Sequence, residues 1–200
     1  GVYCADESMP TIVNCTIDGN SGGLDCYGGG IFVGVDSVST IANCRIRGNV
    51  AACGAGICIH GNSAKVSNCL ISRNHSWWGM SGVYVWSLDM RDPAEFTNCT
   101  IADNFTEEEI GVCCNMSDFY CLDSSVVVTN CITTNGILAE SHTPGQQAYT
   151  ITMSHSLVCV RNGAPSKFTV NSDNNVPVTI VWEEDTPLML LASPLFVDPD

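Results

Sequence analysis

The sequence is poor in basic residues, with 7 Lys and Arg against 21 Asp and Glu and a formal net charge of −14. A surface this acidic repels phosphate backbones and anionic headgroups, so we expect no nucleic-acid partner and no attachment to a membrane surface. The sequence also lacks any run of about 18 apolar residues, the length that a helix needs to cross a bilayer. We therefore expect no membrane insertion.

Metal-binding patterns are missing as well. No Cys-x-x-Cys pair occurs, and the four His residues are scattered at positions 60, 75, 142 and 155. Clustered Cys and His ligands are what a zinc site requires, so we expect no metal cofactor. The acidic loops leave Ca²⁺ as an alternative, because carboxylate oxygens are its usual ligands.

Cysteine, in contrast, is abundant, and five of the 13 Cys residues belong to a repeat. The repeated pairs are Asn14-Cys15, Asn43-Cys44, Asn68-Cys69, Asn98-Cys99 and Asn130-Cys131, each followed by a second Asn. In step with them, Gly1, Gly30, Gly56, Gly82 and Gly111 each precede Val or Ile. A period of 25 to 32 residues indicates stacked similar units.

Apolar residues alternate within each unit in three short runs, which is the period of a β-strand. Strands this short bury their apolar faces only by stacking on the next unit. We therefore predict an all-β fold, a right-handed single-stranded parallel β-helix of about five to six coils. Residues 1–158 form the coils, and 159–200 form an irregular C-terminal cover of the same domain. A leucine-rich or helical solenoid is not supported, because the units contain neither a leucine-rich consensus nor a helical stripe.

The Asn and Cys of each pair are expected to form structural ladders along the stack. Asn side chains can bond to one another and to the backbone of a buried turn. The thiols would stack as small buried hydrophobes, with their Cβ atoms pointing the same way, so we expect them to be mostly free. The fifth unit is irregular, since Cys131 reaches Asn135 one residue too early. A kink after Cys131 and an end to regular coiling near residue 140 are therefore expected.

The pattern "I-x-N-C-x-I-x-x-N … G-G-G-I" resembles that of bacterial secreted or surface proteins with right-handed parallel β-helix repeats, in the pectin-lyase-like superfamily. The segments 152–158 and 193–199 also resemble the end of that fold. The resemblance implies a location outside the cell or on its surface. Because lyases, hydrolases, epimerases and adhesins share these repeats, it does not name a reaction. The chain begins inside a repeat without an initiator Met or a signal peptide, so we expect it to belong to a longer protein.

One outward strip of the first strands carries the candidate binding residues. Its members are Phe32, His60, Tyr84 and Trp86, beside Tyr3, Cys58 and the fifth-unit residues Cys113 and Asn115. Exposed aromatic rings stack on the apolar faces of sugars, so the strip predicts a polysaccharide or glycan as partner. The alternative is that the loops before the Gly entries fold over this strip and cover it.

The sequence does not identify catalytic residues, and we favour a non-catalytic protein. A lyase would need a base together with cations or Ca²⁺, and a hydrolase would need paired carboxylates. The sequence fixes neither arrangement. The favoured hypothesis is an extracellular or cell-surface protein presenting a carbohydrate- or partner-binding face. The alternatives are a fragment of a polysaccharide lyase or glycoside hydrolase acting on an acidic polysaccharide, and a structural spacer of an adhesin.

Overall fold

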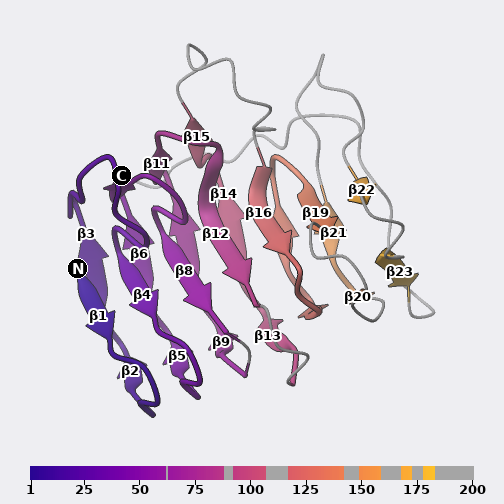
Figure 1. Ribbon diagram of the computed structural model, residues 1–200, viewed down its shortest axis with the longest axis horizontal. Coiled ribbons are helices and arrows are strands. Elements are labelled where there is room, and N and C mark those ends of the chain that lie inside the picture. The colour runs from indigo at the N-terminus through magenta and orange to yellow at the C-terminus, as the bar shows by residue number, and fades with distance from the viewer. Residues whose placement is uncertain are drawn as a thin grey trace.

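The computed structural model describes residues 1–61, 63–87, 92–106, 117–141, 149–158, 168–172 and 178–182. Within these ranges the regular secondary structure consists of strands, and all of the strand pairs are parallel. Figure 1 shows the strands stacked side by side along the long axis, from β1 at one end to β22 and β23 towards the other. The described residues contain no helix long and apolar enough to cross a membrane. The predicted all-β parallel solenoid is therefore confirmed.

The chain winds through three large sheets and one small one, which we call sheets A to D. Sheet A contains β1 (Val2–Cys4), β4 (Ile31–Val33), β8 (Ile57–His60), β12 (Met80–Trp86), β16 (Ser117–Leu122), β19 (Ile137–Ser141) and β22 (Phe168–Ser172). Sheet B contains β2 (Thr11–Val13), β5 (Thr40–Ala42), β9 (Lys65–Ser67), β13 (Ala94–Thr97), β17 (Val126–Thr129), β20 (Tyr149–Ser154) and β23 (Val178–Trp182).

Sheet C contains β3 (Thr16–Asp18), β6 (Arg45–Arg47), β10 (Leu70–Ser72), β14 (Thr100–Ala102), β18 (Ile132–Thr133) and β21 (Leu157–Val158). Sheet D contains β7 (Val50–Ala51), β11 (His75–Ser76) and β15 (Phe105–Thr106). The larger sheets thus hold six or seven strands, slightly more than the five to six coils expected.

The core lies between the sheets and is built from columns of like residues. Ile17, Ile46, Ile71 and Ile101 pair in register along sheet C and are all buried. Because side chains alternate across a strand, every second residue of each short strand reaches this core. Where Phe96 of sheet B meets Phe119 of sheet A, the two rings pack edge to face with centroids 4.7 Å apart. The core is therefore continuous from one sheet to the next.

The fifth unit differs from the sequence-based prediction. We expected Gly111-Val112 to begin the next strand of sheet A, but in the structure Val83 pairs with Phe119 and Tyr84 with Tyr120. Strand β16 therefore takes that place, whereas Cys113 and Asn115 lie outside the described residues. The Gly-apolar pair is only a local signal. In the structure the buried Phe119 fills the core position that we expected Val112 to fill.

The expected kink after Cys131 is not found. Ile132 pairs with Thr100 and Thr133 with Ile101, so the register of sheet C continues through this unit. Thr133 occupies the buried position that Ile fills in the earlier units. The Ile column therefore ends at Ile101, as predicted. Sheets A and B also continue beyond residue 158, through β22 and β23, inside the segment that we expected to be an irregular cover. The rest of 159–200 lies outside the described residues.

The Asn of each Asn-Cys pair occupies a tight turn between sheets B and C. Asn14, Asn43, Asn68, Asn98 and Asn130 all have φ between 51° and 56°, and all five are exposed. Asn tolerates this left-handed conformation better than most residues. Asn130 donates to Asn98, Asn98 to Asn68, and Asn68 to Asn43. We call these five residues the outer Asn ladder, and their exposure corrects our expectation of a buried one.

The thiols next to the outer Asn ladder point inward and are hydrogen-bonded. The Sγ of Cys99 lies 3.3 Å from the carbonyl of Thr97 and 3.6 Å from that of Val66 in the preceding coil. Cys44, Cys69 and Cys131 repeat this geometry, and these thiols are free. Cys15 departs from the expected buried column, because it lies in the first coil and is exposed.

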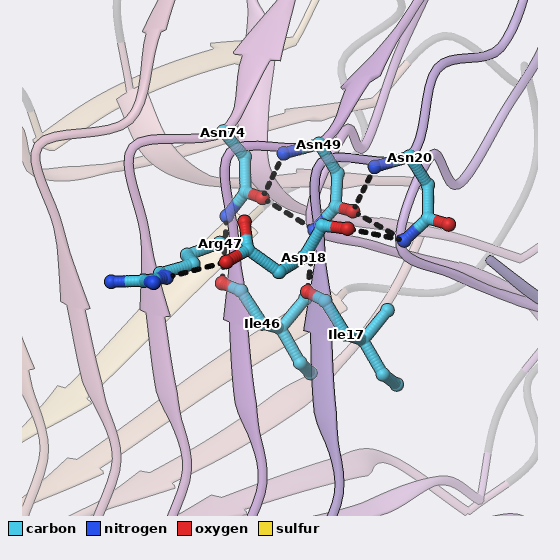
Figure 2. A network of polar contacts seen from close by, with 7 residues as sticks. All are labelled: Ile17, Asp18, Asn20, Ile46, Arg47, Asn49 and Asn74. Atoms are coloured by element: carbon cyan, nitrogen blue, oxygen red, sulfur yellow. Dashed lines mark hydrogen bonds and ion pairs between the residues drawn. The ribbon is translucent and has the colours of Figure 1, made fainter.

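A second ladder, not predicted from the sequence, runs inside the stack. It consists of the second Asn of four units, Asn20, Asn49, Asn74 and Asn104, which we call the inner Asn ladder. The Oδ1 of Asn74 accepts from the backbone N–H of Asn49 at 3.1 Å and from its Nδ2 at 3.0 Å. The Nδ2 of Asn74 in turn donates to the carbonyl of Ile46 at 3.1 Å. Figure 2 shows this pattern repeating from Asn20 to Asn74.

The inner Asn ladder ends on a buried carboxylate. Oδ1 of Asp118 accepts from the backbone N–H and the Nδ2 of Asn104, at 3.1 and 3.0 Å. Oδ2 accepts from the N–H and hydroxyl of Thr134 and from the N–H of Asn135. Burial raises the pKa of Asp118, and the hydrogen bonds from these partners oppose that rise. This side chain of β16 therefore joins the turn at Asn104 to the turn at Thr134 and Asn135 in the next coil.

Candidate functional site

The outer face of sheet A carries two stacked pairs of rings at described positions. Tyr3 and Phe32 lie with ring centroids 5.2 Å apart and planes 4° from parallel. His60 and Trp86 are closer, at 4.3 Å and 5°. Both pairs join neighbouring coils, because Tyr3 is in register with Phe32 and His60 with Trp86. The parallel register thus holds the rings in fixed positions before any partner binds.

These rings differ in how much of them a partner could reach. Tyr3 is 72% exposed and lies on β1, the edge strand of sheet A. Phe32, His60 and Trp86 are half-buried. The same register places Gly34, which has no side chain, beside His60 in the preceding coil. Of the predicted site residues, these three and their neighbour Tyr3 are accessible.

Tyr84 does not belong to the accessible surface, which corrects the expectation of an exposed ring. It is 4% exposed and lies in a second apolar cluster with Cys58, Tyr120 and Leu138. Burial raises the pKa of its hydroxyl, and the nearby Cys58 adds to the effect. Tyr84 therefore supports the face from beneath and does not present a ring to a ligand.

The segments before two Gly entries fold over this part of the sheet. A Cβ at Gly54, where φ is 58°, would lie 2.8 Å from Cβ of Cys58 and 3.0 Å from Cβ of Tyr84. A Cβ at Gly28 would crowd Phe32 in the same way, 2.8 Å from its Cα and Cβ. Only glycine permits such close approach of the backbone at positive φ. These segments therefore cover Cys58 and Tyr84 and contact Phe32, so part of the strip is covered, in the way that the alternative interpretation describes.

One further ring belongs to the face, and the sequence analysis missed it. Tyr27 comes from the covering segment, pairs with Cys53 through an isolated bridge, and is 41% exposed. Its ring lies 6.4 Å from that of Tyr84. No periodic signal marks Tyr27, because it lies in a loop outside the repeated columns. We call the set Tyr3, Tyr27, Phe32, His60 and Trp86 the aromatic face.

A second group of rings lies on sheet D, outside the predicted strip. His75 stacks on Phe105 with centroids 4.7 Å apart, and Trp77 meets His75 edge-on at 4.8 Å. Phe105 is 46% exposed. This cluster provides an internal comparison for the aromatic face, because it offers an exposed ring on a different surface.

Two ion pairs between described residues lie on different sheets of the solenoid. Arg47 pairs with Asp18 at 2.9 Å on sheet C, and Lys65 lies 3.9 Å from Glu95 on sheet B. Each ion pair joins one base to one carboxylate, and all four side chains are well exposed. Acid–base hydrolysis of glycosides requires two carboxylates at one site. Among the described residues there is also no group of three or more His, Cys, Asp or Glu positioned to hold a metal ion.

Comparison with known proteins agrees with the parallel coils. Residues 1–178 match the family model described as "right handed beta helix region". Neither the curated proteins nor the solved structures gave a significant match. The match covers most of the 200 residues, and the strands in it pair as a β-helix requires. The chain therefore belongs to the right-handed β-helix family.

Proposed function

We propose that this protein is an extracellular or cell-surface scaffold that binds a glycan on its aromatic face without catalysing a reaction. The observation that carries the proposal is the pair of ring stacks, Tyr3–Phe32 and His60–Trp86, which the parallel register holds on one face of sheet A. Aromatic rings attract the apolar faces of pyranose rings, and several apolar rings gathered on one face of a protein are typical of a binding site. The location outside the cell follows the secreted and surface proteins that the repeat resembles.

Preorganisation supports binding at these rings. Each stacked partner restricts the motion of its neighbour, and the register of β1 with β4 and of β8 with β12 fixes the spacing along the face. A ligand that meets fixed rings loses less side-chain entropy on binding than one that must order them. The inner Asn ladder contributes from the inside, because it fixes the turn after each strand of sheet C, from which the chain continues through sheet D into sheet A.

The absence of catalysis is proposed because the two ion pairs of described residues, Arg47–Asp18 and Lys65–Glu95, lie on sheets C and B and place no cation beside the aromatic face. A lyase or hydrolase would need its acid and base beside the bound sugar. The two remaining alternatives, an enzyme fragment and a spacer without a ligand, are outcomes of the experiment below.

A glycan array tests the proposal with matched variants. Tyr3→Ala and Trp86→Ala each remove one ring of the aromatic face, and each is expected to weaken binding about tenfold, as the loss of an aromatic stacking partner does. Phe105→Ala is the control, because it removes a comparably exposed ring from sheet D. Thermal melting of each variant separates lost binding from lost folding.

Three results would contradict the proposal. Binding that survives Tyr3→Ala and Trp86→Ala but not Phe105→Ala would move the site to sheet D. A spacer would bind no glycan on the array. An enzyme fragment would release shortened or unsaturated products from a bound polysaccharide.

A further inference from the structure

We infer that the glycan taken by the aromatic face is uncharged, and that uronate-containing or sulfated polysaccharides are excluded. This inference rests on the proposed function and adds the chemical class of the ligand. It comes from the distribution of charge around the rings, which is independent of the stacking that carries the proposed function.

The strands of sheet A contain no Lys or Arg at any position. Among the described residues, the basic side chains belong to the other two large sheets: Arg45 and Arg47 on β6, Lys65 on β9, and Arg73 in the turn after β10. Arg47 and Lys65 are in addition paired with carboxylates. Recognition of a sugar carboxylate or sulfate normally uses Arg or Lys in charge-assisted hydrogen bonds. The described part of this face offers none.

Carboxylates lie next to the rings instead. A Cβ at Gly34 would collide with Oδ1 of Asp6, which shows that this carboxylate lies over Gly34, the residue beside His60 in the preceding coil. Oδ1 of Asp6 accepts the backbone N–H of Val35 at 2.9 Å, so the side chain is held there. Asp36 follows at the same edge, and Gly61, directly after His60, packs against its backbone.

An anionic sugar ring on this surface would therefore approach carboxylates, while the described part of the face offers it no Lys or Arg. Like charges placed together across an interface cost binding free energy, and the cost persists at short range even in salt. A neutral sugar meets no such penalty, because its hydroxyl groups can donate to the carboxylate of Asp6 while its apolar face contacts the rings. The net charge of −14 acts in the same direction on the approach of an anionic polymer.

Isothermal titration calorimetry with three probes of equal length tests the inference: cellohexaose, chitohexaose of N-acetylglucosamine, and hexagalacturonate. We expect at least one neutral probe to bind about tenfold or more tightly than hexagalacturonate at physiological salt, and to lose affinity in Tyr3→Ala. Asp6→Asn keeps an oxygen for the Val35 N–H and removes the charge. It is expected to strengthen hexagalacturonate binding at low salt and not to strengthen binding of the neutral probes, whose hydroxyl groups lose a charged acceptor.

The outcomes separate this inference from the proposed function. Tyr3-dependent binding of hexagalacturonate that equals or exceeds that of the neutral probes, with or without added Ca²⁺, would overturn the inference and leave a glycan-binding face in place. An Asp6→Asn variant that binds hexagalacturonate no better than the wild type would remove the electrostatic basis of the inference. Failure of all three probes would count against the proposed function itself, and the inference would fall with it.

Discussion

Replacing Asn74 with Ala tests how much the inner Asn ladder contributes to stability. The Asn74 side chain is fully buried and makes four hydrogen bonds. Its Oδ1 accepts from the N–H and Nδ2 of Asn49, and its Nδ2 donates to the carbonyl of Ile46 and to Oδ1 of Asn104, at distances between 2.9 and 3.1 Å. The truncation therefore removes partners from three other residues at once.

The magnitude follows from what is left behind. The backbone N–H of Asn49 loses the acceptor that the ladder supplies, in a turn that water does not reach. The Nδ2 of Asn49 and Oδ1 of Asn104 each keep one other ladder partner, so their losses are smaller. An unsatisfied buried group costs about 1–3 kcal/mol, and a lost bond with a remaining partner about 1 kcal/mol. We expect Asn74→Ala to lower the free energy of unfolding by about 3–5 kcal/mol.

Asn68→Gly is the matched control from the outer Asn ladder. This variant also removes an Asn that is hydrogen-bonded on both sides, but Asn68 is exposed and water replaces its partners. Glycine tolerates the φ of 53°, so no backbone strain is added. We expect a cost of about 0.5 kcal/mol or less, because a solvated surface change is nearly neutral. Urea unfolding followed by tryptophan fluorescence measures both variants. Equal costs for the two, or a cost below about 1 kcal/mol for Asn74→Ala, would refute the reasoning.

Three further predictions follow from the thiols and the tyrosines. In the native protein, alkylation followed by mass spectrometry should label the exposed Cys15 and Cys26 rapidly and should label Cys99 only on unfolding. Equal alkylation rates for the three thiols would contradict the burial of Cys99. Cys99→Ser should cost less than about 1 kcal/mol in urea unfolding, because the hydroxyl of Ser156 in the equivalent turn already donates to two carbonyls at 2.8 and 3.3 Å; a larger cost would show that the thiol position rejects oxygen. Burial, with a contribution from Asp123, raises the pKa of Tyr149 to about 12, so the folded state keeps a proton that the unfolded chain loses near pH 10. Stability from this group should therefore fall as the pH rises from about 10 to about 12, and Tyr149→Phe should remove that part of the loss; an unchanged pH profile of urea unfolding would contradict it.

The columns of the solenoid could be predicted from the sequence because they depend on local periodicity alone. Ile46 and Ile71 occupy equivalent positions in successive units, and a strand with alternating side chains places both in the core. The same reasoning failed at the fifth unit. Gly111-Val112 carries the local pattern, but the strand begins at Ser117, where no Gly entry announces it.

The sequence-based prediction placed the wrong Asn of each unit in the buried turn, and the physical reason is a different one. The Asn before each Cys and the Asn five residues after it recur with the same period, so spacing does not distinguish them. The left-handed φ of Asn68 turns its side chain outward, whereas Asn74 turns inward and satisfies the next coil. Only the backbone conformation decides which Asn is buried.

The candidate site was predicted in part because burial on the outer face depends on distant loops. Strand alternation correctly places Trp86 and Tyr84 on the outward side of β12. It does not indicate that the segment around Gly54 covers Tyr84, nor that Tyr27 reaches across the sheet from a loop more than fifty residues earlier. Contacts between segments this far apart leave no signal in the period of either one.

A crystal structure of the protein soaked with a neutral oligosaccharide, cellohexaose or chitohexaose, tests the central claim most directly. We expect sugar density on the outer face of sheet A, with one pyranose ring stacked on the aromatic face and contacts to His60 or Trp86. Sugar bound instead over Phe105 on sheet D, or on the outer faces of sheets B and C, would contradict it.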